Sequence, residues 1–327
     1  MIFSRYWRLH ITLKFSLTAR TKGNFNWSLL SFRMTDQHSN NEENFTPETV
    51  TIINCVLNVP LMLISILGNA LVLAAILRTP SIRSRHMIML CSLAVSDFLV
   101  GLIAQPFYVG QQLTNNSGFV YRVWRQLGSS LCVVTLLTIT AITVDRFLAL
   151  HYHMRYATLV TESRVKIVLI VIWLISFLVS VFDIWNESIY QFTVGSVIAI
   201  SLLISTFSYI RIYRIVRRHQ LNINAQQQAV QNFNAGNNLN ITSLKRSAMN
   251  TFVFFIALII CYFPMYVLLT LHGLSYVFWR RESELATTLV LSNSCINPFL
   301  YCWRLSDLRA AVVKTARKIL CKETEEN

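Results

Sequence analysis

The stretch Tyr121–His151, YRVWRQLGSSLCVVTLLTITAITVDRFLALH, decides the predicted fold. After Arg122 and Arg125 it continues as an apolar run of about 20 residues, enough for one helix to cross the hydrocarbon core of a bilayer. Ser and Thr are tolerated in such a helix because their hydroxyls bond to their own backbone or to a neighbouring helix. The run ends at Asp145 and Arg146, and charges there are functional candidates. The alternative is a snorkelling arginine beside a helix-end aspartate.

The composition indicates an integral membrane protein. Of the 327 residues, 54% are hydrophobic and 13% are charged, and the mean hydropathy is +0.48. A soluble domain carries about a quarter charged residues. The apolar runs are long and unbroken, which favours helices over the alternating strands of a barrel. Because the basic residues behind the net charge of +14 lie at the ends of apolar runs, they indicate membrane topology, and we expect no nucleic-acid partner.

Seven apolar segments follow one another along the chain, at roughly 51–78, 87–110, 121–151, 164–183, 189–215, 246–272 and from Arg280 onward. The sequence therefore predicts an all-α fold, a seven-transmembrane helix bundle. Residues 303–320 place apolar side chains on one face and basic side chains on the other, which predicts a short amphipathic juxtamembrane helix at the C-terminus. Residues 219–243 are rich in Asn and Gln and predict a loop of low complexity.

We expect three parts in the chain: an extracellular N-terminal tail at 1–49, a seven-helix transmembrane domain at 50–302, and an amphipathic helix with a cytosolic tail at 303–327. The loops after the first, third and fifth spans, and the C-terminal tail, are basic. This pattern predicts a multi-pass plasma-membrane protein whose N-terminus is outside and whose C-terminus is cytosolic.

The beginning of the chain differs from the rest in charge. Residues 1–33 carry basic residues and no acid, so we expect that translation begins at Met34 or that this segment is removed. Sequons for N-glycosylation on the outer side are found at Asn44, Asn115 and Asn186.

Polar residues lie at mid-depth in several of the spans: Asn69, Asp97, Thr135, Asn293, Ser294 and Asn297. A carboxylate at the depth of Asp97 costs about 2.5–3.5 kcal/mol on insertion scales, so it needs a polar interior, a partner or an ion. We expect a single internal cluster around Asp97, and separate polar contacts between helices are the alternative. Oxygen ligands of this kind suit a small hard cation such as sodium, and no other cofactor is expected.

Other classes of membrane protein fit the sequence less well. A pump or channel would need a line of ionisable groups, and a transporter would show two related halves with broken helices. The chain has one deep acid and no internal repeat. Five of its cysteines lie inside apolar runs, without metal-ligand spacing. No nucleophile–base pair is visible, so an enzyme is not expected.

Seven motifs, each in its own span, together resemble the rhodopsin-like (class A) G-protein-coupled receptors over roughly residues 50–320. They are Gly68-Asn69, Leu93–Asp97, Asp145–Phe147, Trp173, Tyr209, Cys261–Pro264 and Asn297–Tyr301. The resemblance implies that the binding of an extracellular ligand activates a heterotrimeric G protein, with arrestin and membrane lipids as further partners. A transporter or channel, and a receptor-like scaffold that does not signal, are the alternatives.

The resemblance also implies roles for individual residues. Arg146, restrained by Asp145, would engage the G protein, and Tyr209 and Tyr301 would swing inward to support that state. Tyr262 stands where the family usually has a Trp toggle. Two prolines complete the activation switch, with Pro264 as the hinge of the sixth helix and Pro298 following Asn297 in the seventh. The residues around Asp97 resemble the family's sodium pocket.

Several positions depart from the family pattern. Tyr121 replaces the Cys of the usual outer disulfide, Ser201 replaces a Pro of the fifth helix, and Leu244 replaces the acid that often pairs with the arginine at position 146. The departures look like the melanocortin, lysolipid, cannabinoid and adenosine branch, and they predict high basal activity. Cys321, after the amphipathic stretch, is a predicted palmitoylation site.

The resemblance makes some classes of ligand less favoured but does not identify the ligand. The amine receptors' Asp corresponds to Gly128, the retinal Lys to Leu291 and the adenosine receptors' Asn to Leu269, so none of these ligands is favoured. A lipid, a peptide or a nucleoside-like ligand is left open, and so is a merely solvated rim of charges. The candidate pocket walls are Arg125, Ser129, Cys132, Met265, Leu269, Thr287 and Leu291.

Overall fold

The computed structural model describes residues 47–82, 84–114, 118–152, 155–229, 253, 255–272 and 280–325. Within these ranges the chain is helical and contains no strand. The predicted tail at 1–49 lies almost wholly outside the described residues. The sequons at Asn44 and Asn115, the alternative start at Met34 and the departure at Leu244 also lie outside them.

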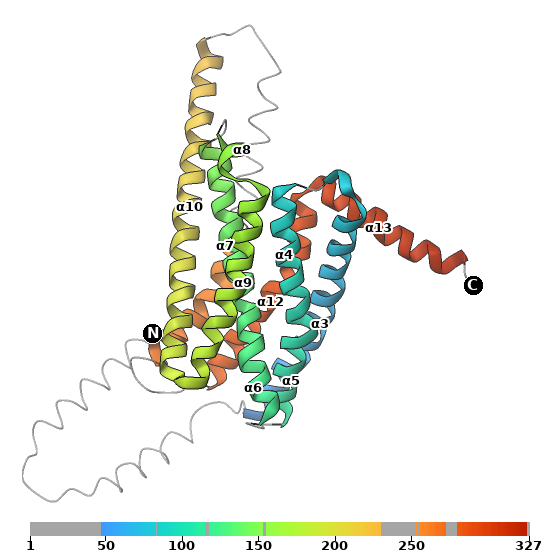
Figure 1. Cartoon of the computed structure of the whole chain (residues 1–327), viewed down its shortest axis with the longest axis vertical. Helices are drawn as coiled ribbons and strands as arrows, with labels where there is room; N and C mark the ends of the chain where they lie inside the picture. The colour runs from blue at the N-terminus through green and yellow to red at the C-terminus, as the bar shows by residue number, and fades with distance from the viewer. Residues whose placement is uncertain are drawn as a thin grey trace, which may run out of the picture. The chain divides into compact units, whose positions relative to one another are not determined.

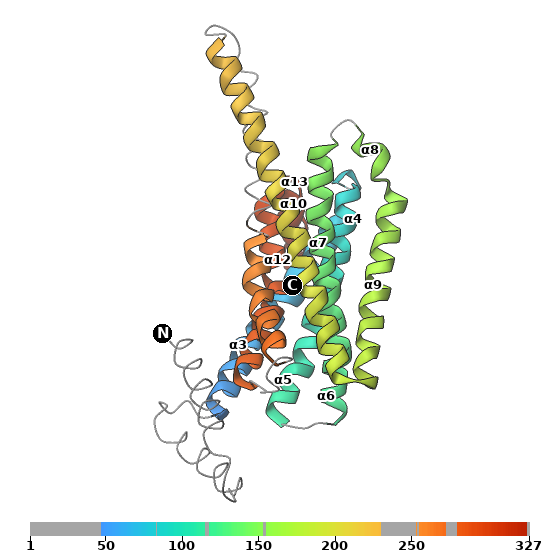
Figure 2. The ribbon, with the colours of Figure 1, turned by 90° about the vertical axis from the view of Figure 1, so that its left-hand side faces the viewer.

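Most of the helices run side by side in a bundle, and the last helix projects away from it (Figures 1 and 2). They are α3 (Pro47–Arg78), α4 (Arg85–Leu99), α5 (Gln105–Thr114), α6 (Phe119–Val123), α7 (Ser129–His151), α8 (Tyr156–Leu159), α9 (Glu162–Trp185), α10 (Glu187–Ala229), α12 (Arg280–Arg304) and α13 (Ser306–Glu325). The sixth span is Phe255–His272. Helix α7 contacts α4, α9 and α10, and α12 packs against α3.

Six of the described helices are long and apolar enough to cross a membrane, and the predicted seventh span is α12. Helix α12 is more polar because it carries Asn293, Ser294 and Asn297, which are all buried. Large apolar side chains such as Leu67 and Leu203 instead lie on the outside. Polar groups inside and apolar groups outside suit a bundle whose surrounding solvent is lipid.

Two spans contain a π-helical turn that the sequence did not predict. The turn η2 (Val100–Ala104) joins α4 to α5, and the turn η3 (Trp124–Gly128) joins α6 to α7. Pro106 is the second residue of α5, next to the end of η2. Since Pro106 has no N–H and its ring crowds the carbonyl of the preceding turn, one extra residue in that turn relieves the conflict.

Two predicted boundaries were wrong. Helix α10 continues to Ala229, so residues 219–229 are helical and do not belong to a loop. The cause is that this Gln-rich segment contains good helix formers and no Gly or Pro. The amphipathic helix α13 continues to Glu325, so Cys321 lies within it and not beyond its end.

The first and seventh spans approach each other closely at Gly68. A Cβ atom placed on Gly68 would lie 3.0 Å from Cγ of Pro298. A larger residue would push the helices apart, and Gly68 therefore allows Asn69, the next residue, to reach the backbone of α12.

Candidate functional site

The mid-depth polar residues meet around Asp97. Its Oδ1 accepts hydrogen bonds from the hydroxyls of Thr135 at 3.0 Å and Ser294 at 2.8 Å. Its Oδ2 accepts one from Nδ2 of Asn297 at 2.7 Å. The side chains come from α4, α7 and α12, and Asp97 has no exposed surface. Thr135, Ser294 and Asn297 thus contact Asp97 directly, as expected for a polar cluster around this residue.

Asn69 closes the cluster on the side of α3. Its Nδ2 donates to the backbone carbonyls of Ser65 at 2.8 Å and Ser294 at 3.1 Å. The hydroxyl of Ser65, which the sequence analysis did not single out, donates to the backbone carbonyl of Asp97 at 2.8 Å. Asn293 is also buried, but no hydrogen bond joins it to Asp97.

The atoms of this cluster fit a small hard cation. Oδ1 of Asn69 is buried and has no hydrogen-bond partner within the described part of the chain. With the Asp97 carboxylate and the hydroxyls of Thr135 and Ser294 it supplies oxygen only, which sodium-like ions prefer. The described residues hold no group of three His, Cys, Asp or Glu side chains that suits a transition metal.

A second polar network lies between α3 and α12, and the sequence analysis missed it. Nδ2 of Asn58 donates to Oγ1 of Thr288 at 3.0 Å, and Oγ1 of Thr288 donates to Oδ1 of Asn54 at 3.2 Å. All three residues are buried. Asn54 and Asn58 are four residues apart in an apolar span, so they lie on one helix face. This spacing is the sequence feature from which the network could have been predicted.

Near the C-terminal end of α7, Asp145 is held by a tyrosine. Oη of Tyr156 donates to Oδ1 of Asp145 at 2.7 Å. No ion pair joins Asp145 to Arg146, although both side chains are described. The Asp145 carboxylate bonds to Tyr156, and its charge also acts on the neighbouring guanidinium of Arg146. The implied restraint of Arg146 by Asp145 stays a prediction. Nε of Arg146 is buried without a hydrogen-bond partner among the described residues.

The short helix α8 positions Tyr156. The guanidinium of Arg85 lies over the Tyr156 ring, 5.4 Å from its centroid, and donates to the backbone carbonyls of Ala157 and Val160. Burial, together with the hydrogen bond to Asp145 and the charge of that carboxylate, raises the pKa of Tyr156 to about 12. Tyr156 is thus a protonated donor at neutral pH.

The sixth span is tied to the third by Tyr262. This tyrosine is buried, and its hydroxyl donates to the backbone carbonyl of Cys132 at 3.1 Å. Closer to the inner end, the ring of Tyr209 stacks on Phe255 of the sixth span at 5.3 Å. Pro264 follows Tyr262 by two residues within the helix. Tyr301 and Pro298 of α12 are both buried, and Pro298 lies against Gly68 of α3.

A cavity of about 270 Å³ opens above Tyr262. All seven candidate wall residues line it: Arg125, Ser129, Cys132, Met265, Leu269, Thr287 and Leu291. Tyr121, Trp124, Glu187, Tyr190 and Gln191 line it as well. Most of the wall is apolar, which is usual for a small-molecule site with a few polar groups that orient the ligand.

Arg125 is the basic residue among the described residues that line this cavity, and it is already paired. Its Nη2 lies 3.0 Å from Oε1 of Glu187, and the guanidinium lies over the rings of Tyr121 and Tyr190. The Arg125 side chain is 18% exposed and the Glu187 side chain 60%. The Glu187 carboxylate is well solvated when it leaves, so the cost of separating the pair lies in Arg125, which needs another anion in its place.

Gly128 gives the cavity its shape on the side of α7. A Cβ atom on Gly128 would lie 2.3 Å from the indole ring of Trp124. The π-helical turn η3 brings the Trp124 ring over its own helix at this point. A larger residue at position 128 would therefore displace Trp124 from the cavity wall.

Two predicted modification sites fall in the described ranges. Asn186 is exposed, and its Oδ1 accepts from the backbone N–H groups of Ser188 and Ile189 at 2.9 and 3.2 Å. It thus caps the N-terminus of α10, which is a reason for Asn here besides glycosylation. Cys321 lies in the last turns of α13. Both modifications stay predictions.

Comparison with known proteins gives the class. The family model of the seven-transmembrane receptors of the rhodopsin family matches residues 68–194 and 181–301. The chain belongs to this family, and it is a multi-pass membrane receptor that couples to G proteins.

Similar proteins of known name include receptors for different kinds of ligand. The histamine H2 receptor of Rattus norvegicus is 31% identical, over 77% of this chain and 75% of its own. The adenosine receptor A2b of Gallus gallus is 25% identical, over 82% and 89%. The melanocortin receptor 4 of Danio rerio is 24% identical, over 83% and 84%.

Proposed function

We propose that an extracellular ligand binds in the cavity above Tyr262 and releases the inner end of the bundle for a heterotrimeric G protein. One observation carries the proposal: Tyr262 lines the cavity and its hydroxyl bonds to the backbone of the third span. A ligand that displaces this hydroxyl changes the contact between the third and sixth spans. Such a ligand binds one conformation better than the other and shifts their populations.

The described conformation corresponds to the resting state in this proposal. Arg146 is partly buried, and its Nε is enclosed by the protein. Tyr209 stacks on Phe255 and keeps the sixth span beside α10. In the active state the sixth span moves outward about Pro264, and Arg146 becomes accessible to the G protein. Arrestin would contact the same end.

Sodium stabilises the resting state in this proposal. Asp97, Thr135, Ser294 and Asn69 would hold the ion through oxygen atoms. The buried carboxylate of Asp97 supports this assignment, because a deep charge without a cationic side chain in contact is costly. The cluster joins α3, α4, α7 and α12, so an ion there favours the conformation in which these helices are close.

The proposed orientation places the cavity on the extracellular side and Arg146 on the cytosolic side of the plasma membrane. The basic residues at the inner ends of the spans support it, including Arg211, Arg214 and Arg217 of α10. The charged face of α13 would lie on the inner leaflet, with Arg309 and Lys314 exposed.

The names of the relatives mention histamine, adenosine and melanocortin, which are different kinds of ligand. They therefore do not identify the ligand of this receptor. Gly128 stands where the amine receptors have their Asp, and the Trp124 ring covers it, so this position offers no carboxylate to an amine. The charged residue that faces the cavity from the third span is Arg125, which suits an anionic group better than an amine.

The test is nucleotide exchange on purified G proteins by receptor in nanodiscs, with panels of lipids, peptides and nucleosides. Leu269→Trp fills the cavity, so we expect it to abolish the response to an active ligand while basal exchange persists. The matched control is Leu203→Trp on the lipid-facing side of α10, where the side chain is 70% exposed. An unchanged ligand response in Leu269→Trp would place the binding site elsewhere.

A further inference from the structure

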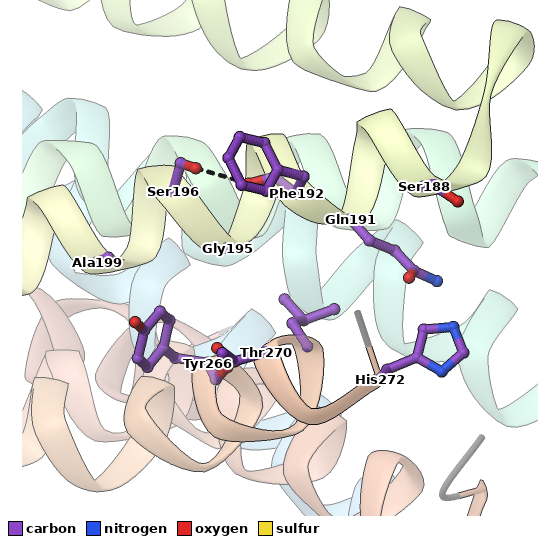
Figure 3. Close-up of a pocket in the computed structure, with 10 residues that line it drawn as sticks. Ser188, Gln191, Phe192, Gly195, Ser196, Ala199, Tyr266, Thr270 and His272 are labelled. Atoms are coloured by element: carbon purple, nitrogen blue, oxygen red, sulfur yellow. Dashed lines mark hydrogen bonds between the residues drawn. The ribbon is translucent and has the colours of Figure 1, made fainter. Parts of the chain in front are cut away.

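A lateral crevice of about 530 Å³ lies between α10 and the sixth span (Figure 3). Its wall on α10 is formed by Ser188, Gln191, Phe192, Gly195, Ser196 and Ala199. The opposite wall carries Tyr266, Leu269, Thr270 and His272. Gln191 points from α10 into the gap, and His272 marks its outer end in Figure 3.

The crevice is open because α10 presents small residues there. A Cβ atom on Gly195 would be 3.9 Å from Cβ of Leu269, an ordinary contact, so the two helices come near each other without interlocking. Gly195 and Ala199 lie four residues apart and share one helix face. Larger residues at these positions would close the space.

The crevice lies at the extracellular ends of two membrane spans. Helix α10 begins at Glu187 and the sixth span ends at His272. Phe192, 78% exposed, stands at the outside of the crevice. In the bilayer this surface faces the outer leaflet, so the molecules that meet it first are lipids.

The chemistry of the crevice differs from that of the other lipid-facing surfaces of the bundle. Ser188, Gln191, Thr270 and His272 gather there, whereas α9 presents Ile167, Ile170, Leu174 and Leu178 to the outside. The hydroxyl groups of Ser196 and Thr270 bond back to their own helices, at 2.8 and 2.7 Å. The crevice thus combines an apolar floor with a polar outer rim.

The crevice and the central cavity are neighbours. Gln191 and Leu269 line both. A polar chain crosses the boundary between them: Arg125 pairs with Glu187 at 3.0 Å, and Nε2 of Gln191 donates to Oε1 of the same Glu187 at 3.2 Å. An anionic group that replaces Glu187 at Arg125 would sit where the two spaces meet.

We propose that the crevice admits a single-chain anionic amphiphile from the outer leaflet, whose head pairs with Arg125 while its chain occupies the crevice. This inference rests on the proposed function, because it names the ligand class for the same cavity. Arg125 is largely buried and its present partner is exposed, so the exchange of one carboxylate for another anion costs little. Phe192, Ala199 and Leu269 supply apolar surface for the chain of the amphiphile, and the hydroxyls of Ser196 and Thr270 are already bonded within their own helices.

The experiment uses the full chain in phosphatidylcholine nanodiscs and a lysophosphatidate with a diazirine in its acyl chain. Photolabelling followed by peptide mapping reports binding without any G protein. We expect saturable labelling of the walls at 188–199 and 266–272. A diacyl phosphatidate with the same diazirine distinguishes bulk bilayer lipid, which would label these walls without saturation.

Variants block each part of the site. Gly195→Trp fills the crevice from α10, and Thr270→Trp fills it from the sixth span. If one of these variants does not fold, the other still tests the crevice. We expect either variant, and Arg125→Gln, to lower labelling about tenfold, which corresponds to a loss of about 1.4 kcal/mol of binding free energy. Leu203→Trp, on the lipid-facing side of α10, is the control.

Labelling that does not saturate, or that is equal in Gly195→Trp, Thr270→Trp and the control, would overturn the inference. That result leaves the proposed function standing if the same preparations still catalyse nucleotide exchange that depends on Arg146. Conversely, saturable labelling without any nucleotide exchange would support the lipid site and contradict the proposed function.

Discussion

Removing the hydroxyl of Tyr262 should raise basal signalling. In Tyr262→Phe the buried ring stays, and the hydrogen bond to the backbone carbonyl of Cys132 is lost. Cys132 lies inside α7, where a carbonyl also accepts from the N–H group four residues further on. The acceptor is therefore not orphaned, and the cost to the resting state is that of one hydrogen bond.

The size of the effect follows from that hydrogen bond. A hydrogen bond between neutral groups contributes about 0.5–1.5 kcal/mol net, and about 1.4 kcal/mol corresponds to a tenfold change in an equilibrium constant. If the active conformation does not make this bond, its population rises about 2- to 13-fold. Basal nucleotide exchange rises by the same factor while the active state is the minor one.

The assay is basal nucleotide exchange by purified receptor in nanodiscs, at equal receptor amounts. Ile260→Val is the matched control, because it also removes one heavy atom from the sixth span but at a lipid-facing residue that is 57% exposed. Equal exchange rates in Tyr262→Phe and Ile260→Val would refute the idea that the Tyr262 bond holds the resting state.

Three further predictions concern other parts of the receptor. Asp97→Asn should make basal exchange independent of sodium, since the carboxylate supplies the charge for the ion; a sodium effect of wild-type size in the variant would place the ion elsewhere. Gly128→Val should lower the midpoint of thermal unfolding, because overpacking against Trp124 costs about 1–3 kcal/mol, and a midpoint equal to that of wild type would contradict it. Burial, the hydrogen bond to Asp145 and the charge of that carboxylate raise the pKa of Tyr156 from 10.0 to about 12, so the protonated phenol contributes stability that is fully present below pH 10 and is lost as the pH rises through about 12. The midpoint of thermal unfolding should fall over this pH range by more in wild type than in Tyr156→Phe. Equal pH profiles of the two proteins would contradict the contribution of Tyr156 to stability.

The arrangement of the polar residues could be predicted because lipid leaves few alternatives. A deep carboxylate must meet other polar groups, so Asp97, Thr135 and Ser294 were expected to lie together. The seven candidate wall residues were proposed from the resemblance to the rhodopsin-like receptors, and all of them line one cavity. These features depend on helical periodicity and on the resemblance, and both are visible in the sequence.

Other features depend on contacts that no local pattern encodes. Tyr156 lies in a short segment after α7, and only the packing of α8 against Arg85 brings it to Asp145. The π-helical turns add one residue per turn without a motif of their own. The lateral crevice follows from two helices that are distant in sequence, so small residues such as Gly195 gave no signal for it.

The most direct test of the central claim compares nucleotide exchange by wild type and by Arg146→Ala, in equal amounts and across the lipid, peptide and nucleoside panels. The account predicts exchange by wild type and none by Arg146→Ala, with equal expression at the cell surface. Equal exchange by both proteins would contradict the role of Arg146, and exchange by neither under any condition would contradict a signalling function for this receptor.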